Sequence, residues 1–84
     1  MEVLIKLAPP QYERLRGQIS SSSIAYEVVE RASRIAHSID GVLFEGYSIT
    51  CDEPQAGALL QIAKRACPEI VRNIEEAMKL AAGR

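Results

Sequence analysis

The 84-residue sequence has no tryptophan, one histidine and one phenylalanine, and no excess of either charge. Ten basic and eleven acidic residues give a formal net charge of −1, and the basic residues form no block along the chain. A basic face is the usual electrostatic signature of a nucleic-acid-binding protein, and exposed aromatic rings usually stack on single-stranded bases. No basic block is present, and four aromatic residues without a tryptophan give little support for base stacking, so nucleic acid is not the favoured partner.

Long apolar runs are also absent, and none approaches the roughly 20 residues that cross a bilayer. Glu2 and Lys6 interrupt the apolar residues at the start of the chain, where a secretory signal would carry an uninterrupted apolar segment. We therefore expect a cytoplasmic protein with no membrane partner. The length predicts one domain over residues 1–84.

Motifs for catalysis and cofactor binding are missing as well. The glycines at positions 41, 46 and 57 match no phosphate-binding or dinucleotide-binding pattern. No pair of cysteine and histidine residues has the spacing of a metal site. We expect no catalytic residues, no cofactor, no metal and no enzymatic activity.

The two cysteines, Cys51 and Cys67, flank a segment with helical periodicity. A helix rises about 1.5 Å per residue, which places them roughly 20 Å apart. A disulfide requires α-carbons within about 7 Å of each other. A disulfide and a shared metal are therefore excluded, and both thiols are expected to be buried apolar groups. The alternative is a reactive thiol at Cys51, because a helix N-terminus lowers a thiol pKa.

The pattern predicts an α+β fold with elements in the order β-α-α-β-α-α. Residues 2–8 alternate as a strand, with Val3, Ile5 and Leu7 on one face. Pro9–Pro10 ends this strand, and a helix follows whose apolar face is Tyr12, Leu15 and Ile19.

Four serines, Ser20–Ser23, predict a break in the helix, with Ser22 or Ser23 capping a second helix. We expect that second helix to run from Ile24 to about Ser38 and to end at Asp40–Gly41. Two antiparallel helices return the chain, so the two strands should be antiparallel. The inward face of the second helix would be Ala25, Val28, Val29, Ala32, Ile35, Ala36 and Ile39.

Val42–Cys51 is rich in β-branched and aromatic residues and predicts the second strand. Its faces would be Leu43, Tyr47, Ile49 and Cys51 on one side and Val42, Phe44, Ser48 and Thr50 on the other, with a bulge or kink near Glu45–Gly46. Asp52 with Gln55 predicts a capping box at the start of the next helix. Its apolar face is Ala56, Leu59, Leu60, Ala63 and Cys67; Pro68 then starts a last helix, whose apolar face is Ile70, Ile74, Ala77, Met78 and Ala81.

His37 would lie in the last turn of the second helix, on its polar face with Glu30 and Arg34, where a partly positive imidazole suits the helix dipole. Asp52 and Glu53 are explained by capping and first-turn charge. None of these residues is expected to act in catalysis.

The segments VLIKL, PPQYERLRGQI, SSSS and IAYEVVERASRIAHS together resemble the ribbon-helix-helix fold of bacterial repressors and antitoxins. The resemblance implies a dimer joined through its strands, with outward strand side chains in the DNA major groove. Here those side chains would be Glu2, Leu4 and Lys6. Glu2 repels phosphate and Leu4 has no polar group, so a DNA-binding repressor or antitoxin is the alternative function.

The favoured function is a non-catalytic protein–protein interaction module of unknown cellular role that binds a second copy of itself or another protein. Two strands alone are marginally stable, so we expect the sheet to be completed across a two-fold axis in a homodimer. The candidate contact residues are Tyr47 and Ile49 on the second strand, with Tyr12 and Leu15 or Ile74 and Met78 on whichever helix remains uncovered.

Overall fold

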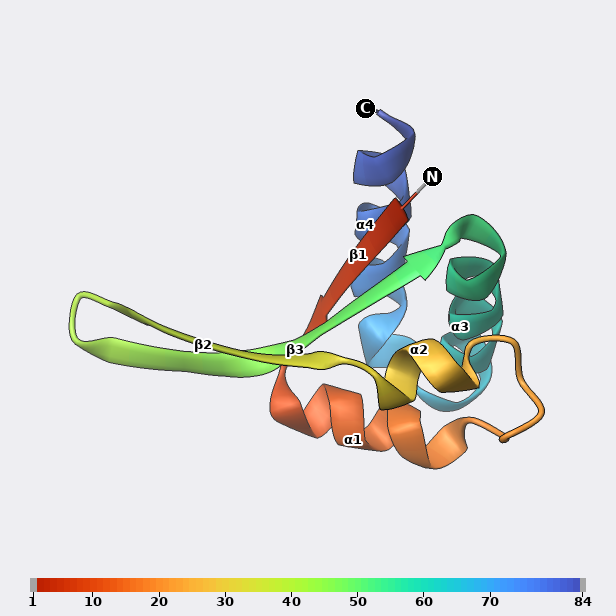
Figure 1. Cartoon of the computed structure of the whole chain (residues 1–84), viewed down its shortest axis with the longest axis horizontal. Helices are drawn as coiled ribbons and strands as arrows, with labels where there is room; N and C mark the ends of the chain where they lie inside the picture. Colours follow the sequence, from red (N-terminus) through yellow and green to blue (C-terminus); the bar gives the residue numbers. More distant parts are fainter. Residues whose placement is uncertain (1, 84) are drawn as a thin grey trace.

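The computed structural model describes residues 2–83, apart from the side chains of His37, Ile39 and Phe44. The elements in chain order are β1 (Glu2–Leu7), α1 (Pro9–Gln18), α2 (Tyr26–Glu30), β2 (Ser33–Ile39), β3 (Val42–Asp52), α3 (Glu53–Ala66), the short 3-10 helix η1 (Pro68–Ile70) and α4 (Val71–Ala82). The strands form an antiparallel sheet in the order β1-β3-β2 (Figure 1). The predicted α+β class is confirmed, as is the antiparallel pairing of the strands that begin at Glu2 and Val42.

The central strand β3 pairs with its two neighbours over different halves of its length. β1 pairs with residues 47–52 of β3, and β2 pairs with residues 42–48. Beyond the end of β1, therefore, β2 and the first half of β3 continue as a two-stranded hairpin. This hairpin projects from the body of the protein (Figure 1).

The hydrophobic core lies between the β1–β3 part of the sheet and helices α1, α3 and α4. The inward row of β1 alternates with an exposed row, as the sequence predicts. Fully burying an aliphatic side chain of this kind stabilises a fold by about 1.5–3 kcal/mol, so the shared core holds the three helices on the sheet. The large side chains that meet there include Val3, Ile5, Leu15, Ile49, Leu59 and Ile74, all with 0% exposure.

The predicted break at Ser20–Ser23 is confirmed, because α1 ends at Gln18 and α2 does not begin until Tyr26. The serine hydroxyls accept local main-chain hydrogen bonds, from the Ser22 N–H to the Ser20 Oγ (3.3 Å) and from the Ala25 N–H to the Ser23 Oγ (3.2 Å). The prediction that Ser22 or Ser23 is the N-cap is wrong, since Ala25 occupies that position.

The prediction of a helix from Ile24 to Ser38 is wrong: α2 has five residues, and Ser33–Ile39 forms β2. Asp40 and Gly41 do not end a helix. They make the turn of the β2–β3 hairpin, with φ values of 52° and 80° and with Ile39 opposite Val42. Positive φ at both turn positions is the requirement of a type I′ turn, which Asp-Gly satisfies well. The element order therefore contains a strand that was not predicted.

Gly46 allows β1 to end close against β3. The registers on both sides of β3 are uninterrupted, so the predicted bulge near Glu45–Gly46 is wrong. A Cβ at position 46 would lie 2.7 Å from the Leu7 carbonyl oxygen. This glycine is therefore explained by a close main-chain approach, the other common reason for a glycine inside a strand.

The first helix of the second half begins at its predicted cap, whereas the last α-helix begins at Val71 and not at Pro68. The Asp52 side chain accepts the Gln55 N–H (2.8 Å) and the Gln55 side chain accepts the Asp52 N–H (3.0 Å), which completes the capping box of α3. The chain is interrupted at Pro68, where η1 leads into α4.

Replacing Gly46 with alanine should lower the free energy of unfolding by about 1–3 kcal/mol, because the new methyl group would push against the Leu7 main chain. Gly57→Ala is the matched control: its Cβ would meet nothing within 4 Å. In the interior of α3 that change should raise the free energy of unfolding by up to about 1 kcal/mol. Urea unfolding followed by circular dichroism measures both. A Gly46→Ala variant as stable as the parent would contradict the close approach.

Candidate interaction site

The six residues predicted as partner contacts are mostly used inside the subunit. Tyr12, Leu15, Ile49 and Ile74 are at most 5% exposed, so they form no exposed surface. Tyr47 and Met78 are partly buried against the same core. The helix faces that carry Tyr12 and Leu15 and that carry Ile74 and Met78 are therefore both covered within one subunit.

Tyr12 illustrates how completely this face is occupied. Its hydroxyl donates a hydrogen bond to the Val29 carbonyl oxygen (2.7 Å), and its ring stacks on Tyr47 with the ring centroids 4.0 Å apart. Burial raises the pKa of the Tyr12 hydroxyl above its ordinary value. The side chain joins α1, α2 and β3, which is a structural role.

Cys51 and Cys67 are free and buried, as predicted. Burial, and to a smaller extent the charge of Asp52, raises the pKa of the Cys51 thiol to about 11. A nucleophilic thiol needs the opposite shift. Asp52 itself is engaged in the capping box.

His37 belongs to β2 and does not lie in the last turn of a helix, so the predicted helix-dipole environment is wrong. Its side chain lies outside the described residues. In the described part of the chain, no three His, Cys, Asp or Glu side chains are grouped so that they could hold a metal ion.

A groove of about 360 Å³ lies between β1 and α4. The residues of β1 that line it are Glu2, Leu4 and Lys6, and α4 contributes the side of the helix next to them, which includes exposed and buried residues. The lining residues from α4 are Arg72, Asn73, Glu76, Ala77, Leu80 and Ala81.

The main chain of β1 is open on the side of this groove. Leu7 directs its carbonyl oxygen towards Gly46 of β3. Neighbouring residues of a strand direct their main-chain groups to opposite edges, so Glu2, Leu4 and Lys6 direct theirs away from β3. The hydrogen bond from the Asn73 side-chain amide to the Lys6 carbonyl oxygen (3.1 Å) agrees with this direction. Within residues 2–83, no other hydrogen bond to these outward groups is found.

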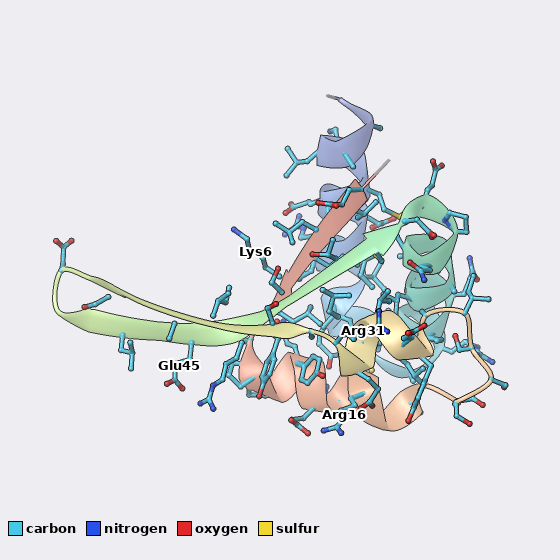
Figure 2. The ribbon with its side chains drawn as sticks, in the orientation of Figure 1. Lys6, Arg16, Arg31 and Glu45 are labelled. Atoms are coloured by element: carbon cyan, nitrogen blue, oxygen red, sulfur yellow. The ribbon has the colours of Figure 1, made fainter. Side chains whose placement is uncertain are left out.

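Two apolar side chains stand at the groove, one on each wall. Leu4 is 44% exposed and Leu80 is 67% exposed, although neither is at a chain turn or loop. Figure 2 shows the Lys6 side chain extending away from the body of the protein at the open edge of β1. Among the ion pairs between described residues, none involves Glu2 or Lys6.

The two ends of the groove differ in charge because of the direction in which α4 runs. Asn73, near the start of α4, contacts Lys6 near the end of β1. α4 then runs back along β1, so that the start of β1 and the end of α4 lie at the same end of the molecule (Figure 1). Lys6 and Arg72 therefore carry positive charge at one end of the groove, and Glu2 carries negative charge towards the other.

Leu80 was not found from the sequence because it falls outside the apolar face of the last helix. Its signal is an isolated leucine three residues after Ala77, on the side of the helix that also carries Asn73. Glu2, Leu4 and Lys6 were identified as the outward row of the strand, but were considered as DNA contacts.

The ribbon-helix-helix resemblance does not extend to the structure. Its second helix was expected over IAYEVVERASRIAHS, where the structure has the five-residue α2 followed by β2. β1 also pairs with β3 of its own chain.

No helix within residues 2–83 is both long and apolar enough to cross a membrane. Comparison of the chain with known protein families, with curated proteins and with solved structures finds no match.

Cys51 should react with iodoacetamide more slowly in the folded protein than in urea. The thiolate is the reactive form, and a pKa raised from 9.0 to about 11 leaves about one hundredth of the thiolate near neutral pH. Between about pH 8 and 10 the folded rate should keep rising, while the unfolded rate levels off above about pH 9. Timed labelling with mass spectrometry of the peptides containing Cys51 and Cys67 measures this. Rapid labelling of folded Cys51 at neutral pH would contradict it.

Proposed function

We propose that the protein is a non-catalytic protein–protein interaction module that works as a homodimer, and that its contact surface is the groove between β1 and α4. The observation that supports this proposal is the open main-chain edge of β1, which lies beside the exposed side chains of Leu4 and Leu80.

An open strand edge is a template for another strand, because its N–H and C=O groups have no partner within the sheet. Natural sheets protect such edges with proline, bulges, charged side chains or a covering element. β1 has no proline and no bulge, and its outward row places Leu4 between the two charged residues. The amide of Asn73 covers only the Lys6 end. A partner that supplies a strand would satisfy the remaining main-chain groups.

Leu80 adds an apolar contact beside that edge. A leucine that is 67% exposed on a helix contributes little to the fold of its own subunit. Its burial by a partner would stabilise the complex by up to about 1.5–3 kcal/mol. The combination of an open edge and an exposed apolar wall is typical of a site that adds a strand from a partner.

The projecting hairpin also favours assembly over isolated function. Two-stranded hairpins are marginally stable in water without a covering face. Val42 and Leu43, at the start of β3, are 55% and 62% exposed. An ion pair between Arg34 and Glu45 (3.6 Å) joins the two strands between the hairpin turn and the body, and Figure 2 shows Glu45 on the projecting part of β3. A partner bound at the open edge of β1 would lie on the side of the protein from which the hairpin projects (Figure 1).

DNA binding receives less support from the same surface. Glu2 and Glu76 stand in the groove with Lys6 and Arg72, so the surface has no net positive charge to neutralise phosphates. Salt-dependent retention of the protein on random duplex DNA would favour the repressor or antitoxin alternative over the proposal.

Substitution of Leu80 by lysine should weaken the homodimer by about tenfold or more, because it replaces an apolar contact with a charge. The matched control is Ile24→Lys, since Ile24 is 61% exposed but does not line the groove. Sedimentation equilibrium over a range of protein concentrations measures both, and circular dichroism confirms the fold.

The proposal requires that the parent protein dimerises, that Ile24→Lys dimerises like the parent, and that Leu80→Lys does not. A parent protein that stays monomeric at the highest concentrations, or a Leu80→Lys variant that dimerises like the parent, would contradict it.

A further inference from the structure

The outward side chains of β1 are complementary in charge to the same row read in the opposite direction. The row reads Glu2, Leu4, Lys6, with a negative charge at one end, an apolar side chain in the middle and a positive charge at the other end. All three side chains are exposed and line the groove. Reversal of the row places each charge opposite the other sign. Such a surface matches the same surface on a second copy related by a two-fold axis.

We propose that β1 pairs in antiparallel orientation with β1 of a second copy about a two-fold axis at Leu4, which rests on the proposed function and specifies its partner strand. Glu2 of each subunit then lies opposite Lys6 of the partner subunit, and the two Leu4 residues lie opposite each other. The two three-stranded sheets become one six-stranded sheet.

The direction of the main-chain groups restricts the register. Only Glu2, Leu4 and Lys6 direct their N–H and C=O groups to the open edge, so each of them must face one of the same three residues on the partner. Registers that place an inward residue opposite an outward one form no ladder. In the registers that remain, an even-numbered residue of one β1 faces an even-numbered residue of the other β1.

Among those registers, the one centred on Leu4 forms the most pairs and the only favourable charge pairs. It has three facing pairs, which exchange about six main-chain hydrogen bonds. Centres at Val3 or Ile5 form two pairs and place a charge opposite leucine. Centres at Glu2 or Lys6 place two like charges opposite each other, which is destabilising.

The α4 wall is compatible with this pairing. A carbonyl oxygen accepts two hydrogen bonds, so the Lys6 oxygen keeps the bond from Asn73 while it accepts a main-chain N–H. The two-fold axis brings the two α4 helices together in antiparallel orientation on the same side of the new sheet. Leu80, on the wall of the groove, then faces the partner's α4.

Charge reversal tests the register. In a dimer of the Glu2→Lys variant, lysine faces lysine in both outer pairs of the ladder. In a dimer of the Lys6→Glu variant, glutamate faces glutamate in both of these pairs. Each single variant should dimerise about tenfold more weakly than the parent at low salt. An equimolar mixture of the two variants should recover the parent affinity as a mixed dimer, and so should the double variant Glu2→Lys with Lys6→Glu.

The matched controls reverse the same charges elsewhere on the surface. Glu13→Lys on α1 and Lys64→Glu on α3 are exposed and lie outside the groove. Each should dimerise like the parent, and mixing them should favour no mixed dimer. Sedimentation equilibrium gives the affinities, and native mass spectrometry with one partner labelled with nitrogen-15 identifies the mixed dimer.

Hydrogen exchange on the parent protein tests the same register without substitutions. The amide hydrogens of Leu4 and Lys6 should exchange more slowly as the protein concentration rises through the dimerisation range. Those of Val3 and Ile5 point towards β3 and should be protected at every concentration.

Recovery of dimerisation in the mixture, together with concentration-dependent protection of Leu4 and Lys6, supports the pairing. A parent protein that dimerises while the mixture fails to recover, or while Leu4 exchanges equally fast at all concentrations, overturns this register and leaves the proposed function standing. A parent protein that remains monomeric overturns both.

Discussion

β1 ends at Leu7 while the strand beside it continues, and most of the architecture depends on that mismatch. Two prolines, Pro9 and Pro10, follow closely and start α1, so the first strand cannot extend. β3 runs five residues further along the sheet, from residue 46 back to residue 42, and needs a different partner there. β2 supplies it. The absence of a Cβ at Gly46 lets the Leu7 carbonyl oxygen approach β3 at the point where one partner replaces the other. The covered core and the projecting hairpin are two consequences of the same boundary.

Local sequence signals were sufficient to predict the elements that have one regular apolar period or a specific capping residue. The alternation of Glu2–Leu7, the capping box at Asp52 and the break at the serines each have one structural explanation, and each was predicted correctly. Residues 31–39 carry no such signal. The spacing of Ala32, Ile35, Ala36 and Ile39 suits a helix, whereas Ile35 and Ile39 also suit one face of a strand. Asp40–Gly41 favours positive φ, which ends a helix or closes a hairpin equally well. The pairing with β3 decides between them, and this tertiary contact is not visible in a local window.

The residues predicted as partner contacts differ from those that line the groove for a related reason. The sequence identifies apolar faces, and the most regular ones were considered as partner contacts. A small domain has few such faces, and the residues buried in the core include Tyr12, Leu15, Ile49 and Ile74. Under the proposed function, a partner uses a residue that does not fit the pattern, Leu80, and the edge of β1, whose main-chain groups are bonded by α4 only at Lys6. The sequence predicts an open edge in a two-stranded sheet, but only the sheet order β1-β3-β2 shows that β1 keeps its free side while β3 is covered on both.

The alternation of β1 separates folding from assembly within six residues. Val3, Ile5 and Leu7 direct their side chains into the core and their main-chain groups to β3, so they determine whether the subunit folds. Glu2, Leu4 and Lys6 direct both to the outside, so under the proposed pairing they determine what the subunit binds. Alternate residues of a strand face opposite sides, so substitutions in the outward row leave the inward row in place. The charge pattern of the outer row can therefore change the choice of partner while the core, and the stability that it provides, stays the same. A single short strand can then carry both the information for the fold and the information for self-recognition.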